Sequence, residues 1–151
     1  MNIRAATLAD VPAIRKLEQQ SSTAAHWAER EYEALFAPEA PKRLALVATE
    51  ADGRVLGFLI ARCVLEQWEI ENIVVAGEVR RGGIGSALVR QLLDQAARAG
   101  AESVFLEVRE SNLAARQLYA ATGFKDSGRR AGYYRDPAED ALLMEISISV
   151  P

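Results

Sequence analysis

The sequence predicts an α/β fold in which helices cover a mixed β-sheet, in one domain spanning residues 1–151. The first observation is the length of 151 residues, which suits one domain with a sizeable core. The second is that strand-like apolar runs alternate with apolar residues at helical spacing, in the order β-α-α-β-β-β-α-β-α-β-β. The third is that no linker, repeat or low-complexity segment interrupts the chain.

The first half of the chain predicts a strand, two helices and then three strands. Thr7 and Asp10 are three residues apart, as in a capping box, so a helix is expected to begin there. Pro38 and Pro41 follow the second helix and end it. The expected elements are a strand at 2–6, helices at 7–17 and 27–36, and strands at 44–49, 55–65 and 68–75.

The second half predicts two helices that alternate with strands, followed by a hairpin. Gly100 suits the C-terminal cap of the first helix. Ser111 or Asn112 suits the N-cap of the second helix, and Gly123 follows its end. The expected elements are helices at 87–99 and 113–121 and strands at 103–108, 124–129 and 141–148, the last two pairing around a Tyr133-Tyr134 loop.

Composition and charge exclude several classes of protein. The net charge of -3 argues against a general nucleic-acid binder, so no direct nucleic-acid binding is expected. Cys63 is the single cysteine, which excludes an intrachain disulfide and a cysteine-based metal cluster, and no metal site is expected. No stretch approaches 18 consecutive apolar residues. We therefore expect a cytoplasmic protein without membrane association, either a monomer or a homodimer.

The glycine-rich segment from Arg80 to Ser86 lies between an apolar run and a helical pattern. Glycines let the backbone approach a ligand closely, and the N–H groups at a helix start favour an anion such as a phosphate. A Walker loop would need a Lys after Gly85, and a dinucleotide fingerprint would need a third glycine. Both are missing, so the remaining alternatives are a different phosphate loop and an ordinary turn between a strand and a helix.

Two motifs resemble those of one enzyme family. The pattern Arg80-x-x-Gly83-Ile84-Gly85 resembles the acetyl-CoA pyrophosphate loop of the GNAT N-acetyltransferases. The stretch 106–124 is similar to the V-x-x-x-N-x-x-A-x-x-L-Y-x-x-x-G-F signature of the same family. Because the two motifs occur in the family's order, coincidence is a poor explanation.

A narrower resemblance points to one branch of this family. The L-E-V-R sequence at 106–109 and the segment 130–141 resemble the RimI-like branch, the alanine N-acetyltransferases of a small-subunit ribosomal protein. The resemblance implies the GNAT fold, a twisted and mostly antiparallel sheet of about seven strands with a splayed pair of strands and about four flanking helices. Where RimI-like chains usually have Pro-Trp-Ser, this chain has His26-Trp27-Ala28, which leaves the acceptor less defined.

The resemblance also implies two catalytic residues. Glu107, the glutamate of L-E-V-R, matches the proton acceptor, and Tyr119 matches the tyrosine that protonates the coenzyme sulfur. The residues alone leave other readings open, because Glu107 could face solvent or pair with Arg109, and Tyr119 could be a packed core tyrosine. Glu69 and Glu71, on the strand before the glycine-rich segment, are rival bases, and Glu71 is the runner-up because it is nearer the expected splay.

Acetyl-CoA is the implied cosubstrate. In the family, a strand backbone binds the acetyl carbonyl and the glycine-rich loop binds the pyrophosphate. The matching residues are Ile73, Val74, Val75, Arg80, Arg81, Gly82, Gly83, Ile84, Gly85, Ser86 and Asn112. The candidates for the acceptor groove are Trp27, Glu71, Tyr133 and Tyr134, and we expect a structural or substrate-loop role for His26.

The expected function is the transfer of the acetyl group of acetyl-CoA to a primary amine, by direct attack and without a covalent enzyme intermediate. The RimI-like resemblance implies that the acceptor is a protein N-terminus, the N-terminal alanine of a ribosomal protein. The first alternative is a GNAT enzyme for a small amine such as a polyamine, an amino acid or an aminoglycoside. The second is a non-catalytic acyl-CoA-binding module, against which the presence of both Glu107 and Tyr119 argues.

Overall fold

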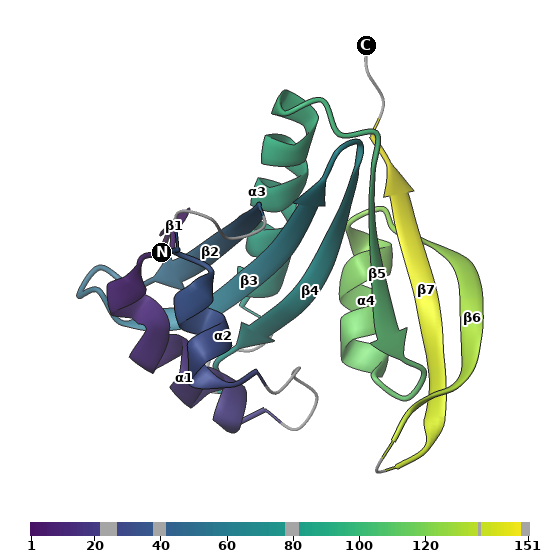
Figure 1. Cartoon of the computed structure of the whole chain (residues 1–151), viewed down its shortest axis with the longest axis horizontal. Helices are drawn as coiled ribbons and strands as arrows, with labels where there is room; N and C mark the ends of the chain where they lie inside the picture. Colours follow the sequence, from purple (N-terminus) through teal and green to yellow (C-terminus); the bar gives the residue numbers. More distant parts are fainter. Residues whose placement is uncertain (22–26, 38–41, 78–81, 136, 149–151) are drawn as a thin grey trace.

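Seven strands form one continuous sheet in the computed structural model, which describes residues 1–21, 27–37, 42–77, 82–135 and 137–148 (Figure 1). The strand order is β1-β2-β3-β4-β5-β7-β6. Within the described residues the chain also forms four α-helices and one 3₁₀ turn. The elements are β1 (Asn2–Ala5), η1 (Leu8–Asp10), α1 (Val11–Gln19), α2 (Glu29–Ala34), β2 (Arg43–Thr49), β3 (Val55–Val64), β4 (Gln67–Val75), α3 (Ile84–Arg98), β5 (Ser103–Arg109), α4 (Leu113–Ala121), β6 (Lys125–Tyr134) and β7 (Glu139–Ser147).

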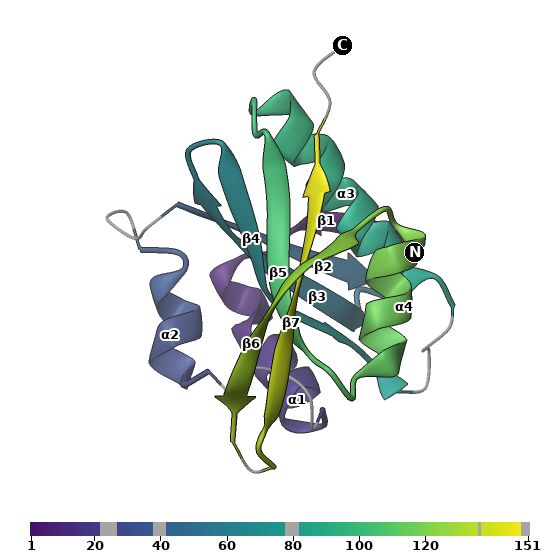
Figure 2. The ribbon, with the colours of Figure 1, turned by 90° about the vertical axis from the view of Figure 1, so that its right-hand side faces the viewer.

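The sheet is antiparallel except where β4 meets β5, which confirms the predicted mixed and mostly antiparallel architecture. The parallel pairing of β4 with β5 runs from Gln67–Ser103 to Ile70–Leu106. Beyond these pairs the two strands diverge, as Figures 1 and 2 show from two directions. The splayed pair of strands expected from the family resemblance is therefore present between β4 and β5.

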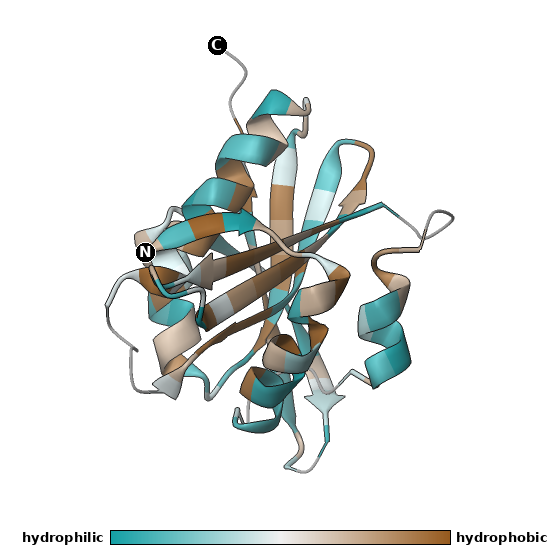
Figure 3. Cartoon of the chain, turned by 90° about the vertical axis from the view of Figure 1, so that its left-hand side faces the viewer, coloured by the Kyte–Doolittle hydropathy of each residue, from teal (hydrophilic) through white to brown (hydrophobic). Residues whose placement is uncertain are grey.

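Helices cover both faces of the sheet, and each face has its own apolar core. One cluster of buried residues joins α3 and α4 to the sheet, with Leu88 and Leu92 fully buried among strand side chains. The other cluster joins α1 and α2 to the opposite face, with Ile14 and Tyr32 buried on it. Figure 2 shows α3 and α4 on one side of the strands and α2 on the other. Figure 3 shows hydrophobic strands beneath helices whose outer surfaces are largely hydrophilic.

A β-bulge in β4 reverses which side chains face which helices. The register between β3 and β4 shifts so that Glu71 is an extra residue on β4. Before the bulge, Ile70 packs in the cluster of α3 and α4, whereas after it Val74 packs in the cluster of α1 and α2. Asn72 is on the same side as Val74, where its side chain contacts Tyr32 of α2. The bulge therefore places two consecutive polar residues on the α1 and α2 side, at the point where β4 leaves β5.

The structure corrects two boundaries in the second half of the chain. The helix expected at 87–99 begins at Ile84, because Ile84 is buried in the core and Gly83, with φ 84°, provides the left-handed turn before it. The strand expected at 124–129 continues to Tyr134, so the predicted Tyr133-Tyr134 loop is wrong. Both tyrosines belong to β6, which pairs with β7 as far as Tyr134 and Glu139.

Three further findings concern the first helix, membrane-spanning helices and metal sites. The expected first helix divides into the turn η1 and the helix α1, and the Thr7–Asp10 capping box is present. No helix of the described ranges is long and apolar enough to cross a membrane. The same ranges contain no cluster of three or more His, Cys, Asp or Glu side chains that could hold a metal ion.

Candidate active site

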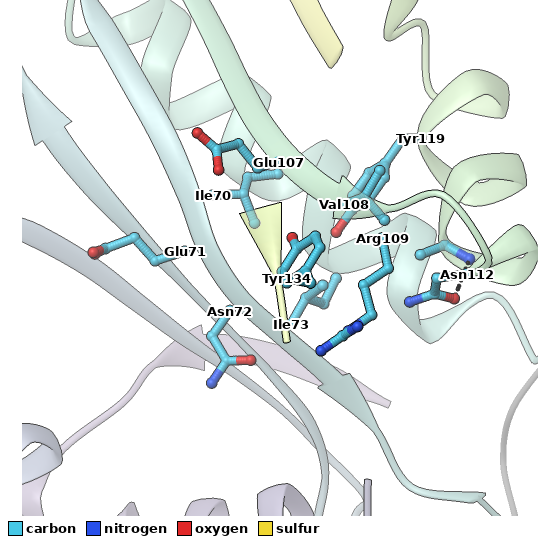
Figure 4. A pocket seen from close by; sticks show the side chains of 11 residues that line it. Ile70, Glu71, Asn72, Ile73, Glu107, Val108, Arg109, Asn112, Tyr119 and Tyr134 are labelled. Atoms are coloured by element: carbon cyan, nitrogen blue, oxygen red, sulfur yellow. Dashed lines mark hydrogen bonds between the residues drawn. The ribbon is translucent and has the colours of Figure 1, made fainter. Parts of the chain in front are cut away.

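A cavity of about 310 Å³ lies where β4 and β5 diverge (Figure 4). Its walls come from β4, β5, α4 with its N-cap, and the end of β6. The residues that line it are Ile70, Glu71, Asn72, Ile73, Glu107, Val108, Arg109, Asn112, Ala115, Tyr119 and Tyr134. The cavity thus contains residues of the 106–124 motif, together with residues of β4 and Tyr134 from β6.

Tyr119 reaches this cavity from α4, a helix whose start is fixed by Asn112. The Asn112 side chain accepts a hydrogen bond from the Ala115 N–H at 3.2 Å, as an N-cap does. The Tyr119 ring is 5% exposed and packs on Phe124, with 5.6 Å between ring centroids. Burial raises the pKa of Tyr119 well above its usual value, and the nearby Tyr134 adds to this rise. The phenol therefore stays protonated at neutral pH and can donate its proton.

Glu107 approaches the cavity from the other side of β5. Its neighbours Leu106 and Val108 are buried in the cluster of α3 and α4, so by strand alternation Glu107 faces the opposite side of the sheet. Its carboxylate accepts a hydrogen bond from Arg130 of β6, with 2.9 Å between Nη1 and Oε1. Figure 4 shows Glu107 and Tyr119 on opposite sides of β5. A substrate in the splay would therefore have a carboxylate on one side and a phenol on the other.

The two rival carboxylates are less suited to act as a base on this cavity. Glu71 is held by Arg43, whose Nε and Nη2 lie 2.7 and 3.3 Å from its two carboxylate oxygens. This bidentate pair engages both oxygens of the carboxylate and holds it toward Arg43. Glu69 has its pKa raised by burial and by the nearby Glu71 and Glu107, but it lies on a separate cavity at the far end of β4.

The described part of the glycine-rich segment, Gly82 to Ser86, leads into the start of α3, beside the end of β4. Gly85 packs so closely on α4 that a Cβ atom there would lie 3.2 Å from a methyl carbon of Leu118. The N–H groups of the first helical turn have no partners within the helix, as at any helix start. The predicted residues Gly82 to Ser86 are gathered here, whereas Arg80 and Arg81 lie outside the described residues.

The other predicted binding residues are divided between the cavity and its surroundings. Ile73 and Asn112 line the cavity, whereas Val74 is buried against α1 and α2, and Val75 ends β4 beside the start of α3. Each of these placements follows from the strand or cap position of the residue, and none of them depends on a ligand.

The residues predicted for the acceptor groove are only partly brought together. Glu71 and Tyr134 line the cavity. Trp27 instead stacks on Tyr32, with 5.3 Å between ring centroids, and Tyr133 is 45% exposed on the outer hairpin. His26 lies outside the described residues.

Sequence reasoning missed two polar residues of the site. Arg109 lies over the ring of Tyr134, with its guanidinium carbon 4.4 Å from the ring centroid, and it also pairs with Glu139 at 3.0 Å. Arg109 was visible within the L-E-V-R motif, but its partners are 25 to 30 positions away and no local pattern reveals them. Asn72 directly follows Glu71 and so interrupts the alternation of apolar and acidic residues along its strand, which was the available signal.

The match to a family model decides which protein family has this site. Residues 11–124 match the model described as the acetyltransferase (GNAT) family, which is more than half of the chain. The chain belongs to the GNAT family. Both predicted motifs lie inside the match or at its border, and the splayed sheet is the fold expected for the family.

Individual relatives extend the GNAT assignment to nearly the whole chain. The ribosomal protein bS18-alanine N-acetyltransferase of Escherichia coli is 34% identical over 143 residues, covering 93% of each chain. A crystal structure of the ribosomal-protein-S18-alanine N-acetyltransferase from Escherichia coli superposes with a TM-score of 0.85 at 32% identity, over 99% of this chain and 95% of that one. A phosphinothricin acetyltransferase from Sinorhizobium meliloti, solved in complex with AcCoA, shares the fold with a TM-score of 0.85 at 20% identity, over 98% and 88% of the two chains.

These likenesses establish the reaction class. The chain is a RimI-like member of the GNAT family and an acetyl-CoA-dependent N-acetyltransferase, which confirms the expectation from its motifs. Its reaction is acetyl transfer to an amine.

Proposed function

We propose that this GNAT enzyme acetylates the N-terminal α-amine of a protein, with Glu107 as the base and Tyr119 as the acid. The observation behind the proposal is the cavity in the splay, which has Glu107 and Tyr119 on opposite sides of β5. The relative from Escherichia coli supports the choice of acceptor, because its name describes the acetylation of an alanine of ribosomal protein bS18. We therefore infer an N-terminal alanine of a ribosomal protein as the acceptor.

Acetyl-CoA, as the substrate, would supply the activated acetyl group as a thioester. The segment Gly82 to Ser86, which leads into α3, suits its pyrophosphate because helix-start N–H groups bind anions, and Arg80 and Arg81 would add positive charge. The backbone of Ile73 to Val75 would hold the thioester, and the proposal is supported by the departure of β4 from β5 at this point. Asn112, which lines the cavity, would contact the coenzyme arm.

The chain's own groups would move the protons of the reaction. An α-ammonium has a pKa of about 8 and must lose a proton before its nitrogen can attack. Glu107 accepts that proton, directly or through a water molecule. The C–N bond then forms as the C–S bond breaks, and Tyr119 donates a proton to the departing sulfur. The nitrogen loses two protons overall. Glu107 passes the first to solvent, and the second, lost as the C–N bond forms, passes through solvent to reprotonate Tyr119.

A two-peptide assay tests the acceptor. One peptide begins with a free Ala-Arg, and the other has the same N-terminus blocked and contains an internal Lys. Incubation with acetyl-CoA and mass spectrometry of both peptides should show acetylation of the free α-amine alone. Acetylation of the Lys peptide, or of neither peptide while acetyl-CoA still binds, would contradict the proposed acceptor and favour a small amine or a binding module.

A further inference from the structure

A buried chain of hydrogen bonds connects α1 and α2 to the wall of the cavity. Glu18 of α1, Tyr32 of α2 and Asn72 of β4 are 4%, 0% and 5% exposed. The Tyr32 hydroxyl donates to Glu18 Oε2, and Asn72 Nδ2 donates to the Tyr32 hydroxyl oxygen at 3.2 Å. Buried polar networks of this kind hold their members in one arrangement. This series of hydrogen bonds ends at Asn72, which lines the cavity. The proposed proton transfers do not use Asn72.

The direction of this hydrogen-bond chain fixes the Asn72 side chain. Glu18 Oε2 also accepts the backbone N–H of Trp27 at 3.1 Å, and a backbone N–H can only donate. With Glu18 as a carboxylate, Oε2 can only accept, so Tyr32 donates to it and the Tyr32 oxygen accepts from Asn72. The nitrogen of the Asn72 amide, which an amide flip would otherwise exchange with the oxygen, must consequently face Tyr32.

The oxygen of Asn72 then faces the cavity. Figure 4 shows this oxygen on the side toward Arg109 and Tyr134 and the amide nitrogen turned away from them. Asn72 directly follows the bulge at Glu71 and is beyond the last pair of β4 with β5. A hydrogen-bond acceptor of fixed orientation thus lies in the splay, on the wall opposite β5 and its Glu107.

We propose that Asn72 Oδ1 accepts an N–H hydrogen bond from the amine that is acetylated, and that Tyr32 and Glu18 are positioning residues for it. This inference rests on the proposed function only in that an amine attacks within this cavity. A neutral primary amine has a lone pair and two N–H groups. When the lone pair points at the thioester carbon, one N–H can face the base side of the splay and the other can face Asn72. An N-methyl amine has lost one of these two N–H groups.

The test compares two acceptors in wild type and Asn72→Leu. The acceptors are the free Ala-Arg peptide and the same peptide with N-methylalanine at its start. Leucine has the same four-heavy-atom, branched side-chain skeleton as asparagine and removes the acceptor, while Tyr32 still donates to Glu18. Wild type should prefer the primary amine by about tenfold or more in kcat/KM, the value of one hydrogen bond. Asn72→Leu should lose most of that preference while the Kd for acetyl-CoA is unchanged, and Asn2→Leu, at an exposed position of β1, should retain it.

A purely structural role for Asn72 would give a different result. An equal loss of kcat/KM with both acceptors, or no loss with either, would overturn the inference. Tyr32→Phe frees the Asn72 amide to turn, so it should reduce the preference as well. If Tyr32→Phe preferred the primary amine over the N-methyl amine as strongly as wild type does, the positioning role of Tyr32 and Glu18 would be overturned.

The same comparison separates this inference from the proposed function. If wild type acetylates a small amine but neither peptide, the proposed acceptor fails. That amine and its N-methyl derivative then replace the two peptides, and loss of the preference in Asn72→Leu still supports the role of Asn72. A wild-type enzyme that acetylates no amine would overturn both proposals.

Discussion

Glu107 is the single residue on which the proposed proton transfer from the amine depends. Glu107→Gln keeps the shape of the side chain and its acceptor for Arg130, but it removes the base. We expect kcat/KM for the α-amine to fall by about 10²–10⁴-fold, the usual contribution of a general base, while the Kd for acetyl-CoA stays unchanged. Steady-state kinetics and calorimetry would measure the two quantities.

A neighbouring glutamate provides the control for this substitution. Glu102 is an exposed residue just before β5, and the variant Glu102→Gln should keep nearly wild-type activity. If Glu107→Gln stayed active and Glu71→Gln did not, the base would be Glu71, despite its pairing with Arg43.

Tyr119→Phe should have a smaller effect on the reaction. The departing thiolate is already a moderately good leaving group, with a thiol pKa of about 8.5, so we expect kcat to fall by about 10- to 100-fold. Because burial raises the pKa of Tyr119 far above its usual value, the proton donor persists into alkaline solution. A spectrophotometric titration should show that Tyr119→Phe removes a tyrosine ionising later than a free tyrosine. An unchanged kcat in Tyr119→Phe would remove Tyr119 from the mechanism.

At the residue scale, sequence motifs predicted those positions whose spacing is local. Glu107, Asn112 and Tyr119 fall within one short stretch, and they line one cavity. Their catalytic and binding roles remain predictions. Asn72 and Arg109 escaped notice because their partners come from distant elements, so their orientation is decided by tertiary packing rather than by neighbours in sequence.

The N-terminal turn before α1 depends on a buried carboxylate. Asp10 accepts two hydrogen bonds from Arg4, at 2.8 and 2.9 Å, and one from the Thr7 N–H at 2.8 Å. The Arg4 hydrogen bonds, aided by Thr7, hold the pKa of Asp10 below its usual value. A lowered carboxyl pKa stabilises the fold above the unfolded-state pKa of about 3.9, and this stabilisation is lost as the pH falls through the lower folded-state pKa.

Asp10→Asn should therefore destabilise the protein in a pH-dependent way. We expect the free energy of unfolding to fall by about 1–3 kcal/mol at pH 7, the value of hydrogen bonds to a charged group. The difference from wild type should shrink below about pH 4. Urea denaturation at several pH values would measure it, with the exposed Asp126→Asn as a matched control. A difference that is constant from pH 7 to pH 3 would show that the Asp10 charge is not responsible.

At the element scale, the sequence predicted the order and type of the helices and strands, and errors arose at their ends. The extension of β6 to Tyr134 was missed because nearly all its residues are exposed and two are glycines, a composition typical of a loop. Pairing with β7 makes it a strand, and that pairing is not encoded in its own pattern. The bulge at Glu71 was missed for a similar reason, since it exists only in the register between β3 and β4.

Across the whole molecule, the splay connects the two faces of the sheet. The start of α3 and the phenol of Tyr119 lie on one face, while Glu107, Asn72 and the helices α1 and α2 lie on the other. Acetyl-CoA and the acceptor would accordingly approach from opposite faces and meet between β4 and β5. This arrangement agrees with direct transfer, which needs both substrates bound at once.

Binding of acetyl-CoA should therefore raise the free energy of unfolding of the whole domain and slow hydrogen exchange locally. Acetyl-CoA at about 100 times its Kd adds about 2.7 kcal/mol to the free energy of unfolding. For a domain of this length, that corresponds to a rise of about 5–10 °C in Tm. Hydrogen exchange should slow at the start of α3 and in β4 beyond Ile70, where the strand has left β5 and the ligand would occupy its open side.

The distribution of this protection decides between two arrangements of the ligand. Amides of β1 and β2 lie at the far edge of the sheet and should exchange at the same rate with and without acetyl-CoA. Protection of β6 and β7 alone, or a rise in Tm without slower exchange at α3, would place the coenzyme outside the splay. In that case the thioester would not lie between Glu107 and Tyr119, and the proposal of direct transfer across β5 would be contradicted.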